Sequence, residues 1–289
     1  MKAHNLTRNL SQIWLTLVPV LTIIFGLGVG YISYKIYLPV WMLNVVLMIA
    51  SMWSLGVFSY KQKDIGQQRV IIGSVLFIIP TLLTSMFFGL GAPPYESPAL
   101  WVETITEQRV RYYFLLAAGL SIAFGFVVVG QQLKKAGEDF YSLLGLMAIA
   151  IASPVFLVNM SFWGFYLTRL YQQMVTAHAS ATPEYLPPLR TMFYYVNILV
   201  SALIYLATLF FSLSLKKTGW FKPSACNCYI VISSLFLVLD LLPPSLPDPF
   251  ATLNFIVSIP AIPFMVPYFI GINLLRRAGN NNAASFTVL

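Results

Sequence analysis

The sequence predicts an all-α, polytopic integral membrane protein with eight transmembrane helices. Of its 289 residues, 58% are hydrophobic and only 9% are charged. The mean hydropathy is +0.79. Soluble domains carry about 25% charged residues, so this chain has too few charges to cover a water-facing surface. Long apolar runs also recur along the whole chain, separated by short polar segments.

Each apolar run is long enough to cross a bilayer as one helix. The hydrocarbon core needs about 20 mainly apolar residues per helix, because a helix satisfies all of its backbone polar groups internally. The predicted spans are Ile13–Tyr34, Val40–Tyr60, Val70–Leu90, Tyr112–Leu133, Leu143–Leu167, Met192–Leu215, Cys228–Leu246 and Phe250–Leu275.

The basic residues predict that both termini are cytoplasmic, in a cell (inner) membrane. Lys and Arg in short loops stay on the cytoplasmic side. With the N-terminus inside, twelve of the 17 basic residues fall on that side. They are Lys2, Arg8, Lys61, Lys63, Arg69, Lys134, Lys135, Lys216, Lys217, Lys222, Arg276 and Arg277. An odd number of spans would break this alternation.

Two short segments predict an internal duplication into halves 1–139 and 140–289. Leu133-Lys-Lys-Ala-Gly137 follows the fourth span, and Leu275-Arg-Arg-Ala-Gly279 follows the eighth. Four spans per half would give both halves the same orientation, with a pathway or pocket at their interface. The alternative is chance, because cytoplasmic helix ends are commonly basic.

Asp240 is the only acidic residue inside a predicted span. A charged side chain near the membrane centre costs about 2.5 to 3.5 kcal/mol on insertion scales. This cost favours a functional role as a proton or cation site. The alternative is hydration near the outer face, since Pro243 and Pro244 follow closely.

Three asparagines extend this candidate polar site: Asn44, Asn159 and Asn197. Amide side chains in membrane helices commonly hydrogen-bond to neighbouring helices, so helix packing is the competing interpretation. In the proposed repeat, Asn44 and Asn197 occupy equivalent depths in the outer leaflet.

Three prolines, Pro260, Pro263 and Pro267, predict a kinked or broken eighth span. Each removes one backbone donor and clashes with the preceding turn. Interrupted helices often line transport sites, although proline is common in membrane helices in general.

Several classes of function are excluded or disfavoured by missing motifs. The charge of +8 is dispersed between apolar runs, which disfavours a nucleic-acid partner. Neither His4 nor His178 falls in a span, and there is no H-E-x-x-H motif or P-loop. The sequence therefore predicts no metal site, no cofactor and no catalytic residue.

The leading hypothesis is a small-solute or ion transporter, or a channel-like protein, with a pathway between the two halves. The first alternative is a structural or accessory subunit of a membrane complex. The second is a membrane-embedded enzyme that modifies lipid. The predicted partners are the lipid bilayer and either another membrane protein or a second copy of the chain.

Overall fold

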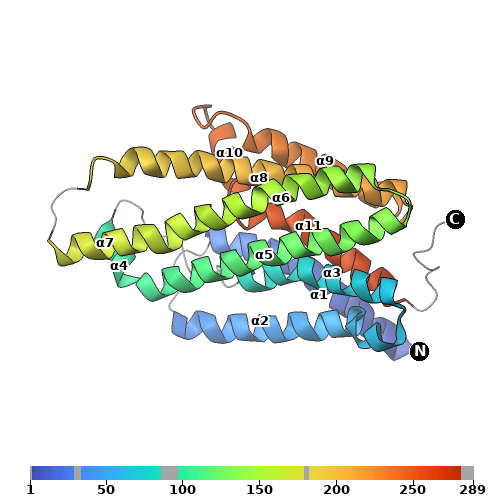
Figure 1. Cartoon of the computed structure of the whole chain (residues 1–289). Helices are drawn as coiled ribbons and strands as arrows, with labels where there is room; N and C mark the ends of the chain where they lie inside the picture. The colour runs from blue at the N-terminus through green and yellow to red at the C-terminus, as the bar shows by residue number, and fades with distance from the viewer. Residues whose placement is uncertain (1, 29–33, 86–96, 179–181, 281–289) are drawn as a thin grey trace.

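The protein is a bundle of long helices (Figure 1). The computed structural model describes residues 2–28, 34–85, 97–178 and 182–280. Within these ranges every regular element is helical, which confirms the predicted all-α class.

In the part of the chain that the structure describes, eight longer helices make up most of the bundle, with shorter segments between them. The longer helices are α1 (Lys2–Gly28), α2 (Tyr34–Leu55), α3 (Ile65–Thr84), α5 (Ile105–Lys135), α6 (Phe140–Ser161), α8 (Leu186–Lys217), α9 (Pro223–Asp240) and α11 (Met265–Ala278). The shorter segments are η1 (Val57–Gln62), α4 (Pro98–Glu103), the π-helix η3 (Phe162–Tyr166), α7 (Leu167–Thr176), α10 (Phe250–Val257) and η4 (Ile262–Phe264).

The described chain contains six helical segments long and apolar enough to cross a membrane, or seven if the bent pair of α10 and α11 is one span. The protein is therefore a multi-pass helical membrane protein. Helix α1 does not meet this criterion over its described residues, so the structure shows six or seven candidate spans, and the predicted eighth is not among them.

Most predicted span boundaries differ by several residues from the helix ends, and two of the differences change the assignment of a residue or the end of a span. Tyr34 was assigned to the first span but begins α2. The seventh span was predicted to reach Leu246, but α9 ends at Asp240. Pro243 and Pro244 follow, and proline cannot continue the ladder of backbone hydrogen bonds. Residues 86–90 of the predicted third span lie outside the described residues.

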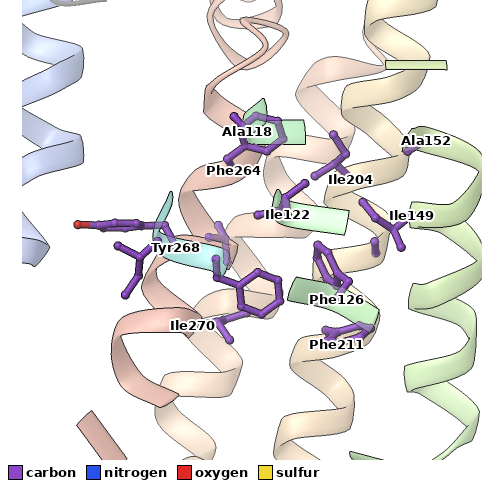
Figure 2. Close-up of a cluster of buried hydrophobic side chains, with 14 of the residues drawn as sticks. Ala118, Ile122, Phe126, Ile149, Ala152, Ile204, Phe211, Phe264, Tyr268 and Ile270 are labelled. Atoms are coloured by element: carbon purple, nitrogen blue, oxygen red, sulfur yellow. The ribbon is translucent and has the colours of Figure 1, made fainter. Parts of the chain in front are cut away.

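Aromatic rings pack against one another in the interior of the bundle. Phe126 contacts Phe77 and Phe211 edge-on, with ring centroids 5.0 and 4.6 Å away. Figure 2 shows Phe126 and Phe211 beside Ile149. Helices α6 and α8 approach closely here because position 145 is glycine: a Cβ on Gly145 would lie 2.5 Å from the Phe211 ring.

The packing does not show the predicted duplication. Helices α3 and α5, the last two of the first half, pack along much of their length, whereas α9 packs more extensively on α8 than on α10 and α11, which make up the last predicted span. The matched glycines also differ. Gly137 has a left-handed φ of 85° and ends α5. Gly279 has φ −74° and lies so close to Leu55 that a Cβ would be 2.2 Å from its carbonyl oxygen.

The start of α1 and the end of α11 lie at the same end of the bundle (Figure 1), where Arg8 Nη2 donates to the Arg276 carbonyl at 3.3 Å. The opposite end carries α4 and α7. The segment Phe140–Thr176 has 37 residues. A straight helix of that length is about 55 Å long, against about 30 Å for a bilayer core. We call the end of the bundle that contains Arg8 and Arg276 the basic end, and the opposite end, which carries α4 and α7, the α4/α7 end.

Candidate functional site

A cavity of about 830 Å³ opens between helices of the two predicted halves. The first half contributes α1, α3 and α5, with Pro19, Thr22, Thr81, Thr84, Arg111 and Tyr112 on the wall. The second half contributes α8 and the region around the break before α11, with Arg190, Tyr194, Asn197, Ser258, Pro260 and Met265. Because the lining residues come from the last turns of α3 and the first turns of α5 and α8, the cavity lies toward the α4/α7 end.

The cavity wall is mainly apolar but contains two arginines. Arg111 belongs to the second turn of α5, is 8% exposed and donates from Nη1 to Gln108 Oε1 at 3.1 Å. Arg190 lies on α8 and is half-buried. Among the described residues that line the cavity, none is acidic. A guanidinium stays charged at any physiological pH, so these two side chains bring positively charged groups to the wall.

A chain of hydrogen bonds runs beside the cavity and includes two of the predicted asparagines. Trp163 Nε1 donates to Asn159 Oδ1 at 3.0 Å. Asn159 Nδ2 donates to Asn197 Oδ1 at 3.1 Å. Asn197 Nδ2 then donates to the Ser258 carbonyl at 2.6 Å. The chain links α6 and η3 to α8 and to the segment that follows α10.

Asp240 joins this network through the side chain of Ser258. The Ser258 hydroxyl donates to Asp240 Oδ1 at 2.7 Å. Asp240 is fully buried, and its Oδ2 has no hydrogen-bond partner within the part of the chain that the structure describes. Ser258 lines the cavity and Asp240 does not, so the carboxylate lies behind the wall.

The side chain of Asn254 caps the end of α9 at Asp240. Its Nδ2 group lies 3.1 Å from the Leu239 carbonyl, 2.9 Å from that of Asp240 and 3.1 Å from that of Leu242. The last carbonyls of a helix have no partner inside the helix. One buried amide therefore caps the end of α9 and fixes the position of Asp240.

The structure places Asn44 outside this network. Asn44 lies on α2 and donates to Ser85 Oγ at 3.1 Å. Thus Asp240, Asn159 and Asn197 are brought together, whereas Asn44 joins α2 to the end of α3.

The three prolines of the last predicted span surround a break. Helices α10 and α11 are bent by 66°, and Pro260 lies in the gap and lines the cavity. Pro263 lies in η4 and Pro267 in the first turn of α11. The break frees backbone carbonyls that lipid could not satisfy. Val257 O accepts from Tyr205 Oη at 2.7 Å, and Ser258 O accepts from Asn197.

Two features of the site were missed by the sequence analysis. One is the π-helix at Phe162–Tyr166, a type of segment frequent at functional sites. Here it presents Trp163 to the cavity and packs Gly164 on Tyr112, where a Cβ would lie 2.3 Å from the Tyr112 Cβ. Gly164 among aromatic residues was the only sign of it.

The other missed feature is the pair of cavity arginines. Their signal was available in the sequence: Arg111 and Arg190 are among the five basic residues that fall on the outer side, against the general bias. Within the described ranges, no group of three or more His, Cys, Asp or Glu side chains is arranged to hold a metal ion. The polar groups that line the wall are hydrogen-bonding side chains and the two guanidinium groups.

Comparison with protein-family models, with curated proteins and with solved structures found no match to this chain. The class of the protein therefore follows from its fold and its site alone. It is a multi-pass helical membrane protein with a cavity between its helices, and a broken helix forms part of the cavity wall.

Proposed function

We propose that the protein is a small-solute transporter or channel-like protein whose pathway passes through this cavity. The observation that carries the proposal is the cavity of about 830 Å³, which is lined from both predicted halves. Small-molecule sites commonly have volumes of about 300 to 1,000 Å³, with mainly apolar walls and a few polar groups.

The broken helix supports the same proposal. Discontinuous helices that meet near a binding site are a recurrent feature of transporters, since their free backbone groups and their hinge serve binding and gating. Here Pro260 and Ser258 belong both to the break and to the cavity wall. A change in the bend between α10 and α11 would alter the shape of the cavity directly.

Filling the cavity should stop transport. Thr191 is exposed on the cavity wall, so Thr191→Trp adds a large side chain where there is room for it. We expect uptake into proteoliposomes, screened with a panel of labelled small solutes, to fall at least about tenfold. This corresponds to about 1.4 kcal/mol of lost binding or an added barrier.

The matched control is Leu199→Trp on the same helix. Leu199 is 52% exposed and does not line the cavity. This variant should transport like the unmodified protein. Equal uptake by both tryptophan variants would contradict a pathway through the cavity, and uptake of no solute by the unmodified protein would contradict transport itself.

We also propose that α1 is an eighth span and that both termini are cytoplasmic. The support is that α1 packs against α2 and α11, and that Tyr268 Oη donates to the carbonyl of the buried Leu15 at 2.6 Å. Since the start of α1 and the end of α11 lie at one end of the bundle, an even number of crossings is required if α1 crosses the membrane.

Reporter fusions test this topology. Fusions after Lys135, Lys217 and Arg277 should read cytoplasmic, because these positions belong to the basic end. A fusion after Ala181 should read external. A C-terminal reporter on the outer side would rule out the eight-span arrangement.

A further inference from the structure

We infer that the cavity binds an amphipathic organic anion, whose acidic group is held by Arg111 and Arg190. The inference rests on the proposed function for its location, because both use the same cavity, and it adds the chemical class of the ligand. Arg111 and Arg190 come from different helices, α5 and α8, and both line the cavity.

The two guanidinium groups on the cavity wall favour an anionic ligand. The two guanidinium groups are the charged groups among the described lining residues, and the nearby carboxylate of Asp240 lies behind Ser258. Both arginines also belong to the first two turns of their helices. The N-terminal ends of helices carry partial positive charge, which adds to that of the side chains.

The planar shape of the guanidinium group favours carboxylate or phosphate as the acidic group of the ligand. Arginine presents paired N–H donors that match the two oxygens of a carboxylate or phosphate. Hydroxyl groups of Thr81, Thr84 and Thr191 line the same cavity and supply further hydrogen-bonding groups.

The apolar side chains on the rest of the cavity wall favour a ligand with a hydrocarbon portion. Leu115, Met160, Ile262 and Met265 contribute apolar side chains to the cavity wall. A fully hydrated inorganic ion gains little from such surfaces, whereas a ligand with a hydrocarbon portion gains from burying it. An acidic head with an apolar body fits both parts of the wall.

This chemistry has two sources, a water-soluble organic acid and the phosphate head group of an anionic lipid. The first is tested with the full-length protein in nanodiscs of phosphatidylcholine, using three probes of similar shape: 4-phenylbutyrate, 4-phenylbutanamide and 4-phenylbutylamine. Isothermal titration should detect binding of the carboxylate, with the neutral amide at least about tenfold weaker and the amine weaker still. Amide or amine binding as tight as that of the carboxylate would overturn the inference.

Arginine variants test the assignment. Arg111→Gln and Arg190→Gln should each weaken binding of 4-phenylbutyrate by about 10- to 100-fold, as expected for the loss of one charge-assisted contact. Arg109→Gln is the matched control, because Arg109 lies on α5 but outside the cavity lining, where Nη2 donates to Gln172 Oε1 at 3.3 Å. It should bind like the unmodified protein. If Arg111→Gln fails to fold, the half-buried Arg190 decides, and unchanged binding in Arg190→Gln overturns the inference.

Native mass spectrometry tests the lipid source. After addition of phosphatidylglycerol or phosphatidylcholine, selective retention of phosphatidylglycerol that is lost in the double Arg111→Gln, Arg190→Gln variant and kept in Arg109→Gln would support a lipid ligand. Binding of 4-phenylbutyrate without such retention would support a water-soluble acid. Binding of neither overturns the inference.

These measurements separate the inference from the proposed function. Equilibrium binding of the anion without uptake into proteoliposomes would support the anion site and reject transport. Uptake of an uncharged solute that is blocked by Thr191→Trp, together with no anion binding, would support transport and reject the anion site.

Discussion

Replacing Glu138 with alanine should lower the free energy of unfolding by about 3 to 5 kcal/mol, because it would leave the three donors that bond to its carboxylate without their acceptor. Glu138 is 3% exposed and lies between α5 and α6. Its Oε1 accepts from Tyr141 N at 3.0 Å, and its Oε2 accepts from Ser142 N at 3.2 Å and from Ser214 Oγ at 2.5 Å. The carboxylate therefore ties the start of α6 to the end of α8.

The expected loss arises from the groups left behind. The first N–H groups of α6 have no partner inside the helix, and the Ser214 hydroxyl is buried. Each buried donor without a partner costs about 1 to 3 kcal/mol. Lys217 contributes little, because its Nζ lies 4.0 Å from Glu138 Oε1 and its side chain is 62% exposed.

The adjacent residue provides the control for this prediction. Asp139 is exposed, and its side chain makes no capping hydrogen bond, so Asp139→Ala should change stability by less than about 0.5 kcal/mol. Glu138→Gln, which keeps an acceptor oxygen, should fall between the two alanine variants. Unfolding by SDS titration in mixed micelles measures all three. Equal losses for Glu138→Ala and Asp139→Ala would contradict the role given to Glu138.

The helices themselves were largely predictable, because a bilayer imposes the length and composition of a span wherever the chain crosses. Their ends were less so. The end of α9 depends on the Asn254 amide, which comes from a different helix and reaches three carbonyls there. The local sequence contains no record of that contact, although Pro243 and Pro244 within the predicted span were a local signal that the helix ends before Leu246.

The polar network shows the same limit. Asn159 and Asn197 were each expected to bond to another helix, but which partner each finds depends on the rotation and depth of α6 relative to α8. The π-helix at Phe162–Tyr166 then changes the rotation of the residues that follow it in α7, because a π-turn contains one more residue than an α-turn. The duplication was predicted from two similar basic helix ends. In the structure, Gly137 and Gly279 have different backbone conformations, and a Cβ would meet Leu55 at Gly279 but nothing within 4 Å at Gly137.

Replacing Asp240 with asparagine should leave the protein folded and remove most of the pH dependence of any transport. The change keeps the size of the side chain and an acceptor for the Ser258 hydroxyl, which donates to Oδ1 at 2.7 Å. It removes the acid itself from a fully buried position, where Oδ2 lacks a hydrogen-bond partner among the described residues. A buried charge without a partner is costly, so stability should be equal or slightly higher.

The pH dependence should change because Asp240 bonds directly to the cavity wall. Ser258 donates its hydroxyl to the carboxylate, lines the cavity and lies at the break between α10 and α11. Gain or loss of a proton on Asp240 would change that bond, and with it the hinge. The titratable groups that face this region from α8 are Tyr194, whose Oη donates to Asn254 Oδ1 at 3.3 Å, and Tyr205. Both phenols remain neutral over the range tested, since a free tyrosine titrates near pH 10.

Uptake into proteoliposomes between pH 5 and 8 measures the effect. One titrating group changes a rate by up to about tenfold per pH unit on one side of its midpoint. We expect such a slope in the unmodified protein and less than about a twofold change over the whole range in Asp240→Asn. Glu184→Gln, an exposed acid at the same end, should keep the original profile. An unchanged pH profile in Asp240→Asn would leave Asp240 a structural role only. Its carboxylate would then serve to hold Ser258, which follows α10, against the end of α9.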